Sequence, residues 1–223
     1  MQGIMETIFD ICYLSFDIIV GVRMIRHSEK NSGYFLFGIM AIVLGAGDAF
    51  HLVPRSYALL TDGLVNHAAA LGIGKLITSI TMTAFYVLLY YVWRRRYNIM
   101  DHAGTTAAVW VLAITRVALC LFPQNQWTSA QPPLSWGIYR NIPFALLGIL
   151  IIVLFFLKTR DRQDPPFRYL WLTIVLSFGF YIPVVLWADA FPMIGILMIP
   201  KTCAYVWTIW TGYSAMKGEL KNE

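Results

Sequence analysis

Apolar stretches long enough to cross a bilayer recur along the chain, each bounded by polar or charged residues. A helix of about 20 apolar residues spans the hydrocarbon core of a membrane. The expected spans are residues 5–24, 34–53, 67–93, 104–122, 134–157, 168–188 and a last span that follows the turn at 189–193 and ends near 216. Pro54 is expected to close the second span, because proline cannot continue a helix without losing a hydrogen bond. The pattern predicts an all-α bundle of seven transmembrane helices, forming a single domain over residues 1–223.

The composition supports this class and excludes an ordinary soluble domain. Hydrophobic residues make up 58% of the chain, charged residues only 13%, and the mean hydropathy is +0.63. The first span has no basic segment before it, so we expect it to remain as a helix and not to be removed as a signal peptide. The three cysteines fall in three separate spans without a CxxC motif, which favours neither a zinc cluster nor a disulfide framework.

The basic residues are distributed unevenly between the connections. The first, third and fifth connections and the tail carry Arg23, Arg26, Lys30, Arg94, Arg95, Arg96, Lys158, Arg160, Arg162, Arg168, Lys217 and Lys221. The second, fourth and sixth connections carry only Arg55. The positive-inside rule then places the N-terminus outside and the C-terminus in the cytoplasm, in a cell membrane. The net charge of +5 is explained by these loops, so we expect no nucleic-acid partner.

Several spans also contain ionisable residues, which are costly in a membrane and mark candidate functional positions. Glu6, Asp10 and Asp17 fall within about 40° of one another on the first helix, so this stripe should face the bundle. Asp48 and His51 are three residues apart in the second span and share a helix face. The small residues at 68–74 indicate tight helix packing, either inside the bundle or in a homo-oligomer.

Depths estimated from the helical rise place most of these residues in the outer half of the membrane. Asp10, Asp48, Arg116 and Arg140 lie about 8–9 Å from the outer ends of their spans, Lys75 and Lys201 lie about 12 Å in, and Asp17 is near the midplane. One explanation is a set of salt bridges that locks the bundle, such as Asp17 with Lys201 or Asp48 with Arg116. The explanation we favour is a water-accessible pocket that is open to the outside.

The charges of the deeper residues indicate what such a pocket would bind. The four cations Lys75, Arg116, Arg140 and Lys201 outnumber the two acids Asp17 and Asp48. This excess of positive charge favours a ligand with a carboxylate, a phosphate or a lipid headgroup, and arginine suits planar contacts with such groups. Prolines in three spans, at 143, 183 and 200, favour a cavity because freed backbone groups often line one. We expect a transporter or receptor that binds a small anionic or amphipathic ligand, with membrane lipids around it. The expected ligand-binding residues are Asp17, Lys75, Arg116, Tyr139, Arg140, Tyr181 and Lys201.

An intramembrane enzyme is the alternative, and the sequence leaves open which of the two the protein is. Asp48 and His51 could form a catalytic acid–base pair that acts on a lipid or small molecule. Together with His67 they could hold a metal, but catalytic zinc usually has three protein ligands, and only two histidines lie on the outer side. We therefore expect no metal and no cofactor.

A further alternative rests on a resemblance. Residues 181–187, with the sequence YIPVVLW, are loosely similar to the sixth helix of microbial rhodopsins. The chain also shares with that family seven spans, an outside N-terminus, its overall length and a lysine within the last span, Lys201. The resemblance implies a retinal photoreceptor that uses Lys201. Against it, the third span has Lys75 and no carboxylate to act as counter-ion, and we do not place the chain in that family.

Overall fold

The computed structural model describes residues 2–30, 32–160, 164–188 and 190–221. In these ranges the chain forms helices and no strand: α1 (Gln2–Arg26), α2 (Gly33–Leu60), α3 (Ala68–Arg96), α4 (Ala103–Leu121), α5 (Leu134–Thr159), α6 (Leu170–Trp187) and α7 (Met198–Glu219), with short 3₁₀ helices η1 (Leu64–His67), η2 (Pro123–Asn125) and η3 (Pro192–Leu197). Arg162, one of the basic residues of the fifth connection, lies outside the described residues.

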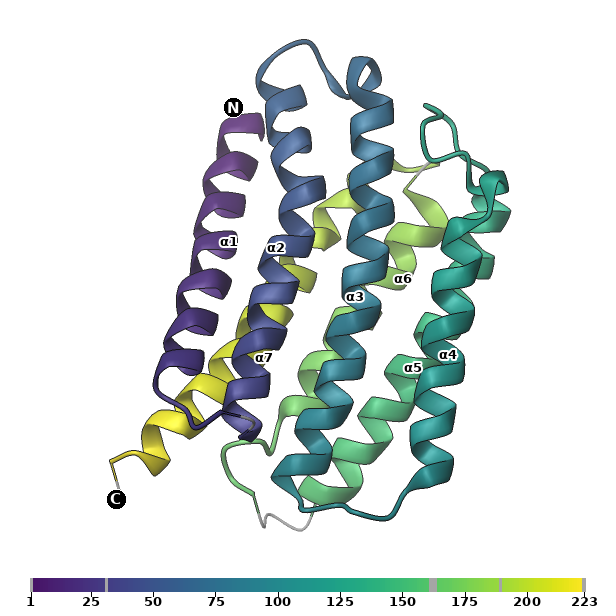
Figure 1. The fold of residues 1–223 in the computed structure, drawn as a ribbon. Helices are drawn as coiled ribbons and strands as arrows, with labels where there is room; N and C mark the ends of the chain where they lie inside the picture. Colours follow the sequence, from purple (N-terminus) through teal and green to yellow (C-terminus); the bar gives the residue numbers. More distant parts are fainter. Residues whose placement is uncertain (1, 31, 161–163, 189, 222–223) are drawn as a thin grey trace.

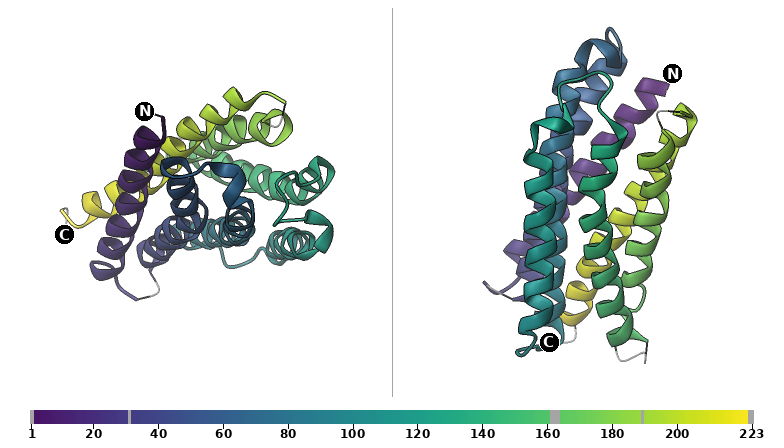
Figure 2. Two further views of the ribbon diagram at one scale, coloured as in Figure 1. Left: turned by 90° about the horizontal axis from the view of Figure 1, so that it is seen from above. Right: turned by 90° about the vertical axis from the view of Figure 1, so that its right-hand side faces the viewer.

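The helices form a ring in which each packs against the next along the chain, and α7 closes the ring against α1. Helices α1 to α4 stand in front in Figure 1, and α5 to α7 run behind them, as the view from above in Figure 2 also shows. The two termini lie at opposite ends of the bundle (Figure 1). We call these the N-terminal end and the C-terminal end.

Length and hydropathy identify the chain as a helical multi-pass membrane protein. Among the described residues, six segments are long and apolar enough to cross a membrane, and they contain α2 to α7. Helix α1 is not among them, because its acidic stripe together with Arg23 and Arg26 leaves no charge-poor stretch of sufficient length. The all-helical membrane bundle is confirmed, whereas the number of spans and the orientation stay predictions.

Prolines interrupt the helices less than expected. The prediction that Pro54 closes the second span was wrong: α2 continues through Pro54 to Leu60. Pro143 and Pro183 likewise lie inside α5 and α6, and Pro200 sits in the first turn of α7, where its missing N–H group costs nothing. Packing against neighbouring helices holds α2 together across the one hydrogen bond that Pro54 removes.

The apolar core fills the half of the bundle nearer the C-terminal end. Large side chains of α2, α3 and α5 with almost no exposed surface, such as Phe37, Met40, Tyr86, Leu89 and Phe155, pack together there. Aromatic pairs such as Tyr86 with Phe144, whose ring centroids are 5.1 Å apart, add to the packing.

An arginine clamp ties the helices together at the C-terminal end. The Arg96 guanidinium donates to both oxygens of buried Asp164, at 3.0 and 3.1 Å, and pairs with Glu219 at 2.6 Å. It also donates to the Tyr34 hydroxyl at 2.8 Å. These contacts join the end of α3 to the start of α2, the segment before α6 and the end of α7. Planar, bidentate pairing of this kind requires arginine.

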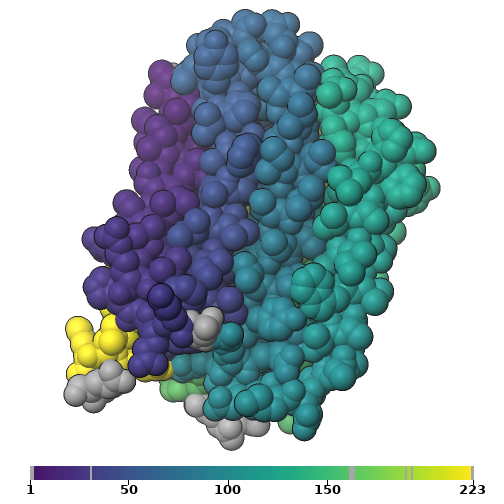
Figure 3. Space-filling view, viewed as in Figure 1, coloured from purple at the N-terminus to yellow at the C-terminus, as the bar shows by residue number. Residues whose placement is uncertain are grey.

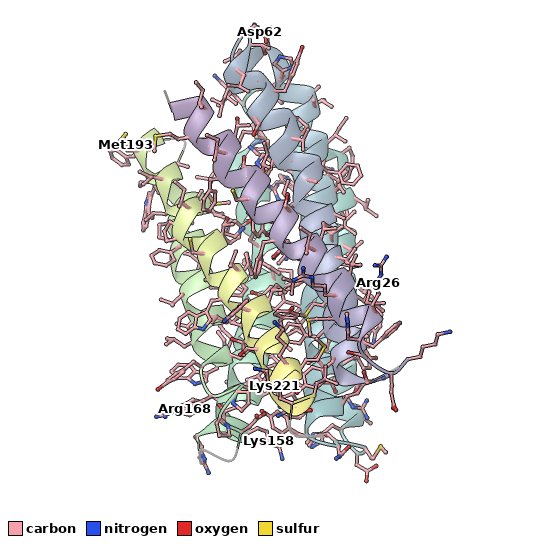
Figure 4. The ribbon with its side chains drawn as sticks, turned by 90° about the vertical axis from the view of Figure 1, so that its left-hand side faces the viewer. Arg26, Asp62, Lys158, Arg168, Met193 and Lys221 are labelled. Atoms are coloured by element: carbon pink, nitrogen blue, oxygen red, sulfur yellow. The ribbon has the colours of Figure 1, made fainter. Side chains whose placement is uncertain are left out.

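Basic side chains gather at this same end. Figure 4 labels Lys158, Arg168 and Lys221 there, with Arg26 toward it, whereas Asp62 and Met193 mark the opposite end. The connections therefore alternate between a basic end and a base-poor end of the bundle, as the sequence pattern predicted for the loops.

Candidate functional site

A cavity of ≈ 240 Å³ opens at the N-terminal end of the bundle. It lies between α2, η1, α3, the segment after α4 and the start of α5, where Figure 3 shows a notch between the top of α3 and the α4–α5 connection. Its ionisable lining residues are His51, Arg55, Lys75 and Arg140, and no described acidic residue lines it. We call this the basic cavity. Three of these four residues, His51, Lys75 and Arg140, were predicted site residues.

Arg140 is positioned by the segment that follows α4. Its Nη1 donates to the Asn125 side-chain oxygen at 2.8 Å, and its guanidinium carbon lies 4.3 Å from the centroid of the Trp127 ring. Asn125, which is fully buried, donates in turn to the carbonyl oxygens of Leu119 and Phe122 at the end of α4. These partners are neutral, so the guanidinium is held in place while its charge stays available to a ligand.

The wall formed by α3 depends on two glycines. A Cβ atom added to Gly72 would lie 1.4 Å from the Trp127 carbonyl oxygen, so only glycine lets α3 approach this segment. A Cβ added to Gly74 would lie 2.2 Å from the carbonyl oxygen of Phe50. That carbonyl is the one that Pro54 leaves without its usual helical partner. The small-residue patch at 68–74 thus makes contacts within the bundle, while the homo-oligomer stays a prediction.

The two basic residues of α2 in the cavity are held differently. The Arg55 guanidinium pairs with Glu6 of α1 at 3.1 Å, which balances part of its charge. His51 lies one turn earlier, and its Nδ1 atom is buried without a hydrogen-bond partner among the described residues. His51 also interacts electrostatically with Lys75, Arg55 and Lys201.

His67 lies apart from this group. Its ring is hydrogen-bonded to Asp62, and this bond holds the pKa of the exposed Asp62 carboxyl below its usual range. Within the described ranges no three His, Cys, Asp or Glu side chains are grouped as a metal site would require. The suggested trio of Asp48, His51 and His67 is therefore not assembled, and the absence of a metal stays a prediction.

The acidic stripe of α1 faces α2, as its helical spacing predicted. Asp10 accepts a hydrogen bond from Ser56 at 3.1 Å, one turn from the Glu6–Arg55 pair. Tyr13 lies on the same face and donates to Asp48 at 2.8 Å. Asp17, at the end of the stripe, has no exposed surface. Tyr13 was not predicted as a site residue, although its place in the stripe is a signal that could have identified it.

The remaining predicted residues lie deeper, beyond the cavity. Lys201 of α7 is 7% exposed, lies about 5 Å from the ring centroids of Tyr181 and Tyr205, and interacts electrostatically with Asp48. Arg116 of α4 is 2% exposed and stands 3.3 Å from the centroid of the Phe144 ring. We call the buried group of Tyr13, Asp17, Asp48, Arg116 and Lys201 the interior cluster.

The structure thus divides the single predicted pocket into the basic cavity and the interior cluster. None of the described residues forms the suggested salt bridges: neither Asp17 with Lys201 nor Asp48 with Arg116 pairs within 4 Å. No hydrogen bond joins Asp48 to His51 there either.

Tyr139 belongs to neither group. It is 52% exposed and packs edge-on against Trp136. Arg55, Asn125 and Trp127 are the cavity residues that sequence reasoning missed. Arg55 could have been found from its place one turn after His51, whereas nothing in a polar, uncharged loop distinguishes Asn125 or Trp127.

Comparison with known proteins adds no further assignment, because no protein-family model, curated protein or solved structure matches this chain.

Proposed function

We propose that the basic cavity binds the anionic group, a phosphate or a carboxylate, of a small or amphipathic molecule at the outer face of a cell membrane. The observation that carries this proposal is the lining: three cationic side chains and a histidine surround ≈ 240 Å³, and none of the described lining residues is a carboxylate. A cavity with one sign of charge and low-dielectric walls concentrates counter-ions of the opposite sign. Its size suits a phosphate group or a short carboxylate rather than a large cofactor.

The positioning of the cations supports recognition of an anion rather than a structural role for the charges. Arg140 is fixed by neutral partners on both sides, Asn125 and Trp127. Its planar fork can therefore meet two anion oxygens without breaking an existing ion pair. Lys75 contributes a second cationic side chain to the same space from α3. The cavity opens at the N-terminal end of the bundle, so a ligand would enter from that end.

A transporter or receptor fits this arrangement better than an enzyme. The proposed acid–base pair of Asp48 and His51 is not joined by a hydrogen bond, and Asp48 is instead bonded to Tyr13. No specific contact supports a reaction at the cavity, so catalysis is not part of the proposal.

We further propose that α1 is the seventh span and that the basic end of the bundle is cytoplasmic. Helix α1 has 25 residues, about 37 Å at the usual rise, and packs along α2 and α7. Its acidic residues face α2 and not lipid. Seven spans place the termini on opposite sides, and the basic connections favour the cytoplasmic side for the C-terminus.

Cysteine labelling of intact cells tests this topology. In a variant lacking the three native cysteines, Met5→Cys and Asp62→Cys are expected to react with a membrane-impermeant maleimide, because both side chains are exposed at the N-terminal end. Lys158→Cys, at the basic end, is expected to react only after the cells are permeabilised. Labelling of Lys158→Cys alone in intact cells would reverse the orientation, and protection of Met5→Cys alone would exclude α1 as a span.

Anion binding is tested by calorimetric titration of the purified protein with inorganic phosphate and with acetate. Saturable binding of either anion to detergent-solubilised, lipid-stripped protein is expected, because the basic side chains already surround the cavity in the ligand-free protein. If the natural source of the anionic group is a lipid headgroup, the unstripped protein carries a phospholipid that phosphate displaces. If stripped protein binds neither anion and unstripped protein carries no lipid, the proposal is wrong.

A further inference from the structure

We propose that Asp17 and Asp48, together with Tyr13, form a proton-binding site beneath the basic cavity, and that a proton bound there accompanies the anion. The proton site stands on its own geometry, whereas its coupling to an anion rests on the function proposed above. Together they describe a protein that binds an anion and a proton as a pair.

Asp17 is buried without a hydrogen-bond partner for its carboxyl group in the described part of the chain. The side chain is fully buried, and neither carboxylate oxygen has a hydrogen-bond partner among the described residues. Its Cβ atom lies only 3.0 Å from where a Cβ of Gly45 would stand, so the backbone of α2 covers it closely. Burying an unpaired, ionised carboxylate in such a place costs several kcal/mol of free energy, far more than burying the neutral, protonated carboxyl group.

Charged and titratable groups from three helices surround Asp17. On α1 it faces Tyr13, on α2 it faces Asp48, and α7 brings Lys201 toward Asp48 and Tyr205 toward Tyr13. Lys201 therefore interacts with Asp48, although no ion pair within 4 Å joins it to either carboxyl group among the described residues. Arg116 interacts with Lys201 but pairs with neither carboxylate. A single bound proton leaves one negative charge on the carboxyl pair, which Lys201 balances.

Tyr13 gives this proton a path between the two carboxyl groups. Its hydroxyl donates to Asp48 at 2.8 Å, and residue 13 precedes Asp17 by one helical turn on the same face of α1. No hydrogen bond joins Asp17 to Tyr13 among the described residues, so a change of side-chain rotamer must first bring the protonated Asp17 to the Tyr13 oxygen. As Tyr13 accepts that proton, it gives its own proton to Asp48. One proton has then moved from Asp17 to Asp48, and Tyr13 is unchanged.

Lys201 links this site to the cavity, because it interacts electrostatically with both Asp48 and the cavity residue His51. An anion beside His51 adds negative charge above the carboxyl pair and so favours the form that holds a proton. Linkage is reciprocal: a bound proton must strengthen anion binding by the same factor. Anion affinity is therefore expected to rise as pH falls, by up to about tenfold per pH unit for one linked proton.

The test uses sulfate, which does not itself titrate near neutral pH. Calorimetry of the purified protein in buffers of different ionisation enthalpy gives the number of protons taken up as sulfate binds. Wild type is expected to take up protons, whereas Asp17→Asn, which keeps the size of the side chain, is expected to bind sulfate without uptake and with a flat pH profile. Asp62→Asn, an exposed acid at the same end, is the matched control and should behave as wild type.

Two outcomes separate a failure of the proton site from a failure of the anion site. Proton uptake in Asp17→Asn equal to that of wild type would overturn the proposal. If sulfate does not bind wild type, infrared difference spectra between Asp17→Asn and wild type at acidic pH, where the site holds its proton without an anion, still test the proton site. A carbonyl-stretch band of a protonated carboxylic acid that is present in wild type and lost in Asp17→Asn supports it, and the absence of such a band in wild type overturns it.

Discussion

Lys75→Met and Arg140→Met are each expected to abolish measurable anion binding while the bundle stays folded. Each variant removes a charged donor that is at least partly exposed, and a hydrogen bond to a charged group is worth about 1.5–3 kcal/mol, which corresponds to about tenfold or more in Kd. Lys75 is exposed apart from its place in the cavity wall, so its loss should change the free energy of unfolding by less than about 0.5 kcal/mol. Calorimetric titration with phosphate gives the affinity, and thermal unfolding in detergent gives the stability.

Two further variants show whether position or charge alone decides the result. Lys221→Met removes a cation at the opposite end of the bundle and should leave phosphate binding unchanged (Figure 4). Arg140→Lys keeps the charge but loses the planar fork that holds Asn125, so it should recover only part of the affinity. Phosphate binding of wild-type strength in both Lys75→Met and Arg140→Met would mean that these charges serve the fold alone.

Gly72→Ala is expected to destabilise the protein and to weaken anion binding together. The added methyl group would meet the Trp127 carbonyl oxygen at 1.4 Å, a contact with backbone that no side-chain rotation relieves. Separating α3 from this segment should cost about 1–3 kcal/mol or more in the free energy of unfolding. It should also shift Trp127 away from Arg140 and so disturb the cavity.

The control for this variant is Gly179→Ala in α6, where an added Cβ has open space. Alanine favours helix over glycine by up to about 1 kcal/mol, so Gly179→Ala should be neutral or slightly stabilising. Thermal unfolding and phosphate titration of both variants make the comparison. Equal unfolding temperatures for Gly72→Ala and wild type would show that the close approach of α3 to Trp127 is not needed for stability.

The helices could be predicted because a membrane permits few solutions. Long apolar stretches must be helical to satisfy their backbone groups, and charges end them at the interfaces. The end of α2 was misplaced because a proline costs a helix only one hydrogen bond and a clash, which packing against α1 and α3 offsets. Helix periodicity also identified the α1 face that meets α2, since the spacing of Glu6, Asp10 and Asp17 fixes their common direction.

The division of the polar residues into two groups could not be predicted from depth alone. Depth along a helix gives the height of a residue in the membrane, but not whether its side chain points into the centre of the bundle or toward a gap between two helices. Lys75 and Lys201 were placed at the same depth, yet Lys75 lines the basic cavity and Lys201 is buried in the interior cluster. Trp127 and Asn125 shape the cavity from a loop whose path depends on tertiary contacts with Gly72 and α4.

Native mass spectrometry of gently solubilised protein, wild type beside Lys75→Met, tests the anion site most directly. The account predicts that wild type carries a bound phosphate- or carboxylate-containing molecule, either a phospholipid or a small metabolite, and that this mass is absent from Lys75→Met. The measured mass would also show which of the two sources supplies the anionic group. The same bound mass at the same occupancy in both proteins, surviving the loss of Lys75, would contradict an anion site in the basic cavity.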